Sequence, residues 1–286
     1  MYKRQVKAGS KLVIHWGSGL KNNAGMSYVM LGRSQKLEDI YILKEKKIER
    51  KDIKVDKDAL KESNMLEEEF LILKEVEEST FSDCFTISYI NINRVLPHLA
   101  DVKYDDTFMQ SDVISLGETW LQPDELVSFE DEDFVGSQVN IGNGKGIMAF
   151  AKVQHDASTK TFFCESFSAI YMETSSVDLI FLYLSQKFDW EKLEKLFQIW
   201  ISPQKGIAVI GDVNIDYIDD DHEMIQFLEG HGFTQLIQNP THIRGGLIDQ
   251  IYVNEVLMKK NAFTSQRSVT YSDHDKIVLH IPLENK

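Results

Sequence analysis

Residues 205–216 read Lys-Gly-Ile-Ala-Val-Ile-Gly-Asp-Val-Asn-Ile-Asp, and this stretch decides the fold class. An apolar run rich in β-branched residues and bounded by glycines predicts a buried strand over residues 207–210. Asp212 and Asn214 follow Gly211 two residues apart, so their side chains project to the same side of the strand end. A carboxylate beside a carboxamide at the edge of a sheet suits a hard cation and a phosphate oxygen. An Asx turn at the end of an ordinary strand would explain the same residues without any chemistry.

The composition is that of an ordinary soluble globular protein, with 43% hydrophobic and 27% charged residues in a chain of 286. No apolar run is long enough to span a bilayer, and the N-terminal residues do not lead into a signal segment. Cys84 and Cys164 are too few for a disulfide framework or a zinc cluster, which favours a reduced intracellular setting. We therefore expect no membrane partner and an intracellular, nuclear location.

Charge is spread unevenly along the chain, although the net charge is −14. Residues 1–59 hold 14 Lys and Arg against 7 Asp and Glu, a net charge of +7. The remainder holds 17 against 38, a net charge of −21. This asymmetry indicates two segments of different origin. The acidic segment can still bind a phosphodiester if its carboxylates hold metal ions, because the ions invert the local field.

The basic N-terminal segment is predicted to contain one or two strands within residues 6–16. Residues 28–33, Tyr-Val-Met-Leu-Gly-Arg, resemble the last motif of Pif-type superfamily-1 DNA helicases. The resemblance implies that Arg33 corresponds to the arginine that contacts the γ-phosphate of ATP. No Gly-x-x-x-x-Gly-Lys-Ser/Thr motif occurs in the chain, so we expect no ATP binding. We interpret residues 1–57 as a helicase remnant that forms a small β-rich appendage.

Residues 58–82 are densely charged, and the spacing of their apolar residues predicts a helical linker over roughly residues 58–78. The charge run is typical of a solvated helix face. Contact of the preceding basic residues with DNA is the alternative. The third domain then covers residues 83–286.

Strand and helix patterns alternate through this third domain, which favours a layered α/β domain. We expect a loop over residues 129–143 and a turn over residues 241–246. The predicted helices are residues 95–104, 177–188, 190–200 and about 219–230. The predicted strands are residues 85–91, 111–121, 147–151, 162–171, 207–211, 247–253 and 276–281.

Seven polar side chains share one feature, since each lies at a strand end or in a turn that leads into a strand. Ligands of layered α/β folds gather at such ends, so the set predicts a single site. The chemistry that suits it is hydrolysis of a phosphodiester with a bound divalent ion, Mg²⁺ or Mn²⁺. The seven residues are Asn91, Glu118, Asp212, Asn214, Asp249, Asp273 and His274.

Each of these residue types has a chemical role in that reaction. Glu118 and Asp273, helped by Asn91, can hold the metal through oxygen. Asp212 can orient and deprotonate the attacking water, while Asn214 can donate to a phosphate oxygen. His274 can also donate to the phosphate if Asp249 holds it in one tautomer.

The order Asn … Glu-Thr-Trp … Gly-Asp-x-Asn … Ile-Asp-x-Ile … Ser-Asp-His resembles the endonuclease/exonuclease/phosphatase superfamily over about residues 83–284. The resemblance implies a four-layered α/β sandwich, in which two packed mixed sheets are flanked by helices and the site lies at one edge. The sequence is most similar to apurinic-type endonuclease domains of mobile elements. Some Helitron-like elements place such a domain directly behind a Pif-type helicase, which agrees with the motif at residues 28–33.

The resemblance also implies a phosphate-contacting tyrosine, which we assign to Tyr171. Met172 and Glu173 follow it where related mobile-element nucleases usually carry Arg-Ser, and Glu173 would repel a phosphate backbone. Lys145 and Arg244 remain as phosphate contacts, and His242 has either a substrate contact or a turn role. We therefore predict weak DNA affinity that falls steeply with salt.

Two alternatives to a DNA endonuclease remain at this stage. One is a domesticated relative that binds DNA or protein without catalysis, which the acidic charge and Glu173 favour. The other is a phosphatase of the same superfamily that acts on a small substrate. The tryptophans are expected in the core, as most tryptophans are, and not as base-stacking platforms.

Overall fold

The computed structural model describes residues 12–15, 40–43, 83–129, 133–142, 144–202, 204–218 and 222–283. The chain divides into two units between Thr80 and Phe81. In the first unit, strands β1 (Leu12–His15) and β2 (Ile40–Leu43) pair in parallel, and β1 lies within the segment predicted to contain strands. The helicase-like motif at residues 28–33 and the predicted helix at residues 58–78 lie outside the described residues.

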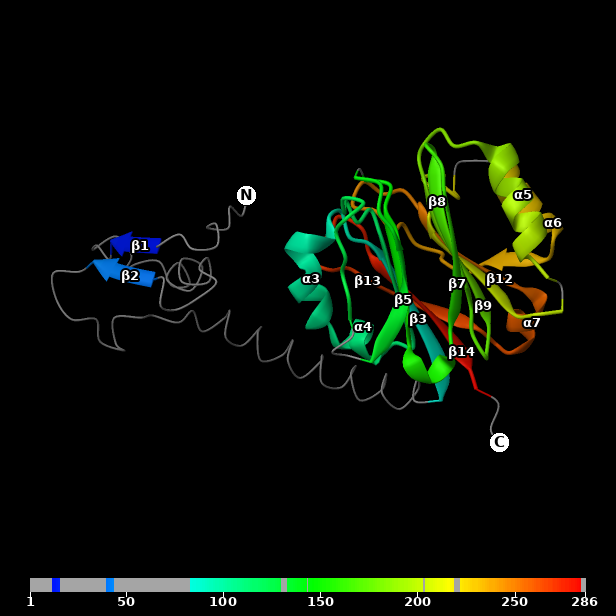
Figure 1. Ribbon diagram of the computed structural model, residues 1–286, viewed down its shortest axis with the longest axis horizontal. Helices are drawn as coiled ribbons and strands as arrows, with labels where there is room; N and C mark the ends of the chain where they lie inside the picture. Colours follow the sequence, from blue (N-terminus) through cyan, green and yellow to red (C-terminus); the bar gives the residue numbers. More distant parts are fainter. Residues whose placement is uncertain are drawn as a thin grey trace. The chain divides into compact units, whose positions relative to one another are not determined.

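The second unit contains two mixed six-stranded sheets that pack face to face (Figure 1). The first sheet has the order β13-β14-β3-β4-β6-β5 and the second has the order β11-β12-β10-β9-β8-β7. The strands of the first sheet are β3 (Cys84–Asn91), β4 (Val113–Gly117), β5 (Phe134–Val139), β6 (Ile147–Lys152), β13 (Phe263–Arg267) and β14 (Lys276–Pro282). Those of the second are β7 (Ser158–Phe163), β8 (Phe167–Glu173), β9 (Asp178–Leu184), β10 (Ile207–Asp212), β11 (Phe233–Gln235) and β12 (Asp249–Asn254).

Helices cover the outer faces of both sheets, which gives the four layers that the superfamily resemblance implies (Figure 1). On the first sheet these are α3 (Val95–Lys103) and α4 (Asp106–Gln110). On the second they are α5 (Trp190–Trp200) and α6 (Glu223–Gly230), while α7 (Glu255–Lys259) follows β12 directly. A short 3-10 helix, η5 (Val153–His155), follows β6.

Three apolar clusters hold the layers together. The central cluster contains side chains from both sheets, for example Ile87 of β3 and Leu179 of β9. The two outer clusters lie between α3, α4 and the first sheet, and between α5, α6 and the second sheet. Alternate residues of the inner strands therefore enter different clusters, and burial on both faces explains why these strands are almost wholly apolar.

The predicted helix at residues 177–188 is wrong, because this segment contains the central strand β9. All seven residues of β9 are buried, and its neighbours are β8 on one side and β10 on the other. A continuous apolar run can be a buried strand or a buried helix, and periodicity alone does not separate the two. Here the backbone pairing of β9 with β8 and with β10 shows that the segment is a strand.

Two further predictions fail at hairpins. The predicted strand at residues 162–171 is the β7–β8 hairpin, which turns at residues 164–166. The predicted loop at residues 129–143 contains β5, the edge strand of the first sheet, whose partner is β6. Edge strands such as β5 and β7 are only partly buried, so their sequences lack the apolar run of a central strand.

Strand direction brings the ends of six strands to one edge of the sandwich. β3 runs parallel to β4 in the first sheet, and β9 runs parallel to β10 in the second, so these four strands end there. β14 is antiparallel to β3, and β12 is antiparallel to β10, so these two strands begin there. In the described residues, no helix is long and apolar enough to cross a membrane.

Candidate active site

Hydrogen bonds between the two sheets join the polar side chains at this edge. Asn91 at the end of β3 donates from Nδ2 to Asp212 Oδ2 at the end of β10, over 2.8 Å. Tyr183 of β9 donates from its hydroxyl to Glu118 Oε1, just after β4, over 2.6 Å. The Tyr89 hydroxyl of β3 accepts from the Asp212 backbone N–H over 2.9 Å. Each sheet therefore supplies half of one site.

Asp212 is an enclosed carboxylate, with 1% of its surface exposed. Its Oδ1 accepts the Asn214 backbone N–H over 2.9 Å, while Oδ2 accepts from Asn91. Burial raises the pKa of Asp212 to about 8, and the charge of Asp249 adds to this, although His274 and Asn91 oppose it. Gly211 is required beside it, because a Cβ there would lie 1.9 Å from the Leu182 carbonyl oxygen.

Asn214 turns the chain out of β10 in the left-handed conformation, with φ 51°, which asparagine tolerates better than most residues. Its Nδ2 donates to the Leu184 carbonyl oxygen at the end of β9 over 2.7 Å. An amide nitrogen carries two hydrogens, so this bond fixes the side chain and leaves a second donor, which faces the Tyr183 hydroxyl. The amide is therefore held beside Asp212 in one orientation.

His274 and Asp249 form a buried pair, with 2.7 Å between His274 Nδ1 and Asp249 Oδ2. Because the carboxylate can only accept, Nδ1 carries the proton and Nε2 is the ring nitrogen that can act on a ligand. Burial lowers the pKa of His274, but the Asp249 hydrogen bond and the charges of Asp249, Asp212 and Asp273 outweigh it and raise the pKa to about 9. Within the described residues, the buried Asp249 Oδ1 has no hydrogen-bond partner.

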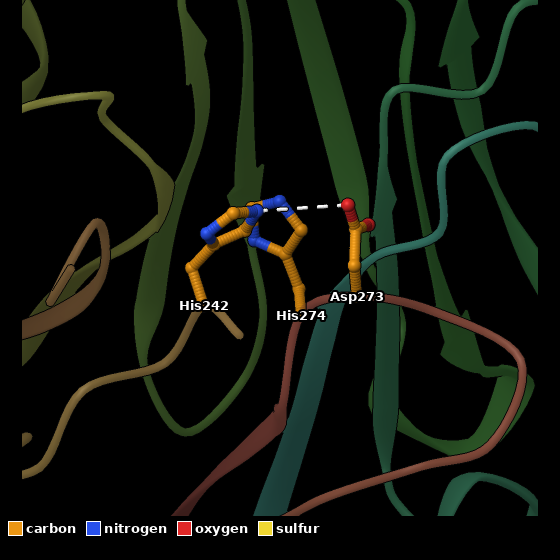
Figure 2. A group of neighbouring side chains, drawn as sticks. All are labelled: His242, Asp273 and His274. Carbon is orange, nitrogen blue, oxygen red and sulfur yellow. Dashed lines mark ion pairs between the residues drawn. The ribbon is translucent and has the colours of Figure 1, made fainter. Parts of the chain in front are cut away.

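A second histidine, His242, lies against His274 (Figure 2). His242 and His274 are bridge partners on antiparallel segments, and their ring centroids are 4.7 Å apart. His242 Nε2 lies 3.6 Å from Asp273 Oδ2, while His242 Nδ1 accepts the Arg244 backbone N–H over 3.2 Å. An accepting Nδ1 leaves the proton of a neutral imidazole on Nε2, so His242 directs an N–H donor toward Asp273.

Two overlapping groups of side chains could hold a metal ion. They are Asp212, Asp249 and His274, and His242, Asp273 and His274, with the ligand atoms of each group within 4.8 Å of one another. Glu118 lies just after β4 of the first sheet, and a hydrogen bond from Tyr183 of the second sheet holds its carboxylate in place. Carboxylate oxygens dominate this set, which fits a hard divalent cation such as Mg²⁺ or Mn²⁺.

The predicted Tyr171 does not join this group. Its hydroxyl donates to Asp178 Oδ2 over 2.7 Å, and its ring stacks on Trp200 on the helical side of the second sheet. Asp178 begins β9, whereas Tyr183, which does join the group, lies near its end. Five residues of strand separate these positions, or about 16 Å. We therefore replace Tyr171 by Tyr183 as the candidate tyrosine.

The argument from Met172 and Glu173 changes for the same reason. Met172 is buried in the central cluster, and Glu173 forms an ion pair with Lys205. Glu173 lies beside Asp178, at the opposite end of the sheet from Asp212. Glu173 is therefore not placed to repel a phosphate at the site.

The predicted substrate contacts lie in loops. Lys145 belongs to the loop before β6, and its Nζ donates to the Glu165 carbonyl oxygen. Arg244 lies in the turn that follows His242 and is exposed. His242 is part of the predicted turn, and its Nε2 faces Asp273; its role as a substrate contact stays a prediction.

Sequence reasoning missed three residues that fix the geometry of the site. Tyr89 is two residues before Asn91, so strand alternation places both on one face of β3, and this signal was present in the sequence. Tyr183 was hidden by the wrong helix prediction. Ser272 accepts the His274 N–H and donates to the Asn91 carbonyl oxygen, which joins the loop before β14 to β3.

No protein-family model and no curated protein matches the chain. Its fold is similar to that of an AP endonuclease from Archaeoglobus fulgidus, at 16% identity and a TM-score of 0.55, covering 69% of this chain and 99% of that one. It is also similar to the endonuclease domain of TRAS1, a telomere-specific non-LTR retrotransposon, at 15% identity and a TM-score of 0.52, covering 71% and 100%. An endonuclease/exonuclease/phosphatase family protein from Leptotrichia buccalis matches at 15% identity and a TM-score of 0.50, covering 70% and 100%. The likeness confirms the predicted α/β sandwich.

Proposed function

We propose that this chain is a divalent-metal-dependent phosphodiester hydrolase and that its substrate is DNA. The observation that carries the proposal is the pair of hydrogen bonds that link the sheets, Asn91 to Asp212 and Tyr183 to Glu118. They collect carboxylates, an amide and a histidine around one point, and these are the groups that a phosphodiester hydrolase needs. The endonucleases with a similar fold support the same reaction class.

Glu118, Asp273 and Asn91 are the residues that would hold the metal. A bound divalent cation supplies charge neutralisation for the phosphate and its leaving oxygen. Tyr183 fixes one oxygen of Glu118, and the Asn93 backbone N–H donates to Asn91 Oδ1 over 3.1 Å, so both side chains are pre-oriented. Pre-orientation of this kind commonly raises metal affinity by about 10- to 100-fold.

Asp212 is the proposed base. Asn91 and the Asn214 N–H hold its two oxygens in a fixed plane, which orients a water molecule for in-line attack on phosphorus. Asp212 takes a proton from that water as the water oxygen bonds to phosphorus and the bond between phosphorus and the leaving oxygen breaks. Burial favours this transfer, because a carboxylate in an enclosed site binds a proton more readily than one in water.

His274 and Asn214 are the proposed phosphate contacts. Asp249 holds His274 through Nδ1, so Nε2–H donates to a non-bridging phosphate oxygen as negative charge develops there. The second N–H of the Asn214 amide donates beside it. His242 and Arg244 in the turn before β12, and Lys145 in the loop before β6, are the further proposed substrate contacts.

The proposal is tested by plasmid nicking with purified protein in Mg²⁺. We expect Asp212→Asn and Glu118→Gln to lower nicking at least 100-fold. Glu194→Gln is the matched control, because Glu194 is a half-buried carboxylate on the outer helix α5 whose Oε1 accepts only from Gln198 in the described hydrogen bonds. Equal nicking by Asp212→Asn and the parent protein would overturn the mechanism.

Two further results separate the alternatives. No nicking by the parent protein at any Mg²⁺ concentration, together with DNA binding, would favour a non-catalytic DNA-binding relative. Hydrolysis of an inositol phosphate without nicking of plasmid would favour a phosphatase. A mobile-element origin and a nuclear, intracellular location also remain proposals, which the motif order and the helicase-like segment at residues 28–33 support.

A further inference from the structure

A cation–π pair lies beside Glu118 at the edge of the site. The Arg94 guanidinium carbon lies 4.8 Å from the centroid of the Trp120 ring. Arg94 follows β3 by three residues, and Trp120 follows β4 by three residues, so the two loops that leave these parallel strands meet here. Trp120 lies two residues from Glu118, which places their Cα atoms within about 7 Å. We name Arg94 and Trp120 the Arg-Trp shelf.

The backbone of the shelf is held in an unusual conformation. Asn93, Arg94, Glu118 and Trp120 all have left-handed φ angles, of 44°, 86°, 49° and 56°. Such angles in non-glycine residues are uncommon and cost free energy, so they persist only where the surroundings impose them. The Arg94 N–H donates to the Glu118 carbonyl oxygen over 2.9 Å, which ties the two loops together.

Trp120 is exposed although it belongs to a residue type that is usually enclosed. It retains 39% of its surface, which corrects the expectation that the tryptophans lie in the core. Its neighbour Leu121 is fully buried and anchors the loop. A Cβ on Gly144 would lie 3.0 Å from the indole ring, so any side chain at this position would press on the ring.

We propose that the Arg-Trp shelf stacks one nucleobase adjacent to the scissile phosphate. The inference rests on the proposed phosphodiester hydrolase function and specifies its substrate as nucleic acid with an unstacked base. An exposed indole offers a flat surface to any base, and the guanidinium above it adds positive charge beside a phosphate. The strained loops fix both groups relative to Glu118, so the base and the phosphate are positioned together.

The test compares two oligomers of equal length in the full-length protein with Mg²⁺. One is a single-stranded oligonucleotide, and the other has abasic tetrahydrofuran units in place of every nucleoside. We define the base preference as the ratio of kcat/KM for the first to kcat/KM for the second. We expect Trp120→Ala to lower this ratio about tenfold, Arg94→Gln to lower it by less, and Trp120→Phe to retain part of it.

Tyr104→Ala is the control, because Tyr104 is an aromatic residue with 87% of its surface exposed after α3. It should keep the parental ratio. Thermal melting checks that each variant folds, and Trp120→Phe keeps the test informative if Trp120→Ala unfolds. An unchanged ratio in a folded Trp120→Phe and a folded Arg94→Gln overturns the proposal.

A binding measurement separates this proposal from the proposed function. Fluorescence anisotropy with both oligomers in the Asp212→Asn background requires no cleavage. Weaker binding of the base-containing oligomer alone on Trp120→Ala supports the shelf even if the parent protein hydrolyses neither oligomer. Equal loss of binding to both oligomers contradicts the shelf even if the parent protein is an active nuclease.

Discussion

The two ends of the second sheet each carry a tyrosine that donates to a carboxylate, but the charges around the two carboxylates differ. At one end Tyr171 donates to Asp178, and at the other Tyr183 donates to Glu118. Lys205 forms ion pairs with both Asp178 and Glu173 at the first end. In the described ion pairs, the site end has only the imidazoles of His274 and His242 as partners of its carboxylates.

This difference separates a structural network from the network that we propose binds a cation. A lysine satisfies the carboxylates at the Tyr171 end, so that end needs no ligand. The site end brings Asp212 and Asp249 opposite each other on neighbouring strands and adds Asp273 and Glu118 nearby. Like charges that no lysine or arginine neutralises in the described ion pairs are costly, and a divalent ion would remove that cost.

The largest expected effect concerns the histidine at the site end. His274→Asn should lower the rate of phosphodiester hydrolysis by about 1,000-fold, because the N–H donor to the phosphate is lost. Asp178→Asn, at the other end of the sheet, should lower it less than twofold. Single-turnover kinetics on one DNA substrate measure both. Similar losses in the two variants would mean that the ends do not differ in function.

The stability of the metal-free protein should fall as pH rises. The pKa of Asp212 is raised to about 8, so its stabilising contribution is complete below about pH 4 and is lost as pH rises to 8. The pKa of His274 is raised to about 9, so its contribution is lost between about pH 6.5 and 9. Each group changes the free energy of unfolding by about 1.4 kcal/mol per pH unit at most.

Urea unfolding at a series of pH values in EDTA measures this dependence. Asp212→Asn should flatten the curve between pH 4 and 8, and saturating Mg²⁺ should raise stability most at high pH, where the carboxylates are charged. Stability of the metal-free protein that rises through this window would contradict the pKa directions. Glu194→Gln provides the comparison, since its curve should follow that of the parent.

The two tyrosines sharpen the comparison directly. Tyr183→Phe removes the hydrogen bond to Glu118, so Mg²⁺ affinity should fall by about 10- to 100-fold with little loss of stability. Tyr171→Phe should leave Mg²⁺ affinity unchanged and lower the free energy of unfolding by about 1 kcal/mol. Calorimetric titration with Mg²⁺ and chemical unfolding of both variants decide between these outcomes. The reverse result would restore Tyr171 as the site tyrosine.

The smallest expected effect belongs to Lys205. Lys205→Gln should lower the melting temperature by less than Tyr171→Phe does, because the lysine is half exposed and water replaces much of its interaction. Mg²⁺ affinity should not change. A differential scanning calorimetry trace and a Mg²⁺ titration check both statements, and a weaker Mg²⁺ affinity would show that the two ends are coupled.

The sequence predicts correctly those helices and strands whose apolar pattern matches the face that the structure buries. The bounds predicted for α5 match the structure at both ends, and the Asp189 side chain caps it by accepting the Lys192 N–H. Strand β10 and the strand ends that carry Asn91, Asp249 and His274 were also predicted. The sequence places these residues beside short apolar runs, which are bounded by turn residues and have the length typical of a strand.

The failures came from segments where local pattern does not define the structure. Strand β9 was mistaken for a helix because burial on both faces removes the alternation that identifies a strand. Because of that error, Tyr183 was not predicted at a strand end, and Tyr171 was assigned as the site tyrosine in its place. The exposure of Trp120 depends on loop contacts with Gly144 and Arg94, which lie far away in the sequence and follow only from the packed fold.

The most direct test of the central claim is anomalous diffraction from a crystal soaked in Mn²⁺. The claim is that carboxylates from both sheets hold one cation site. We predict an anomalous peak about 2 Å from a Glu118 carboxylate oxygen, between the ends of β4 and β10. Full Mn²⁺ occupancy elsewhere on the molecule, with no peak at Glu118, would contradict the account.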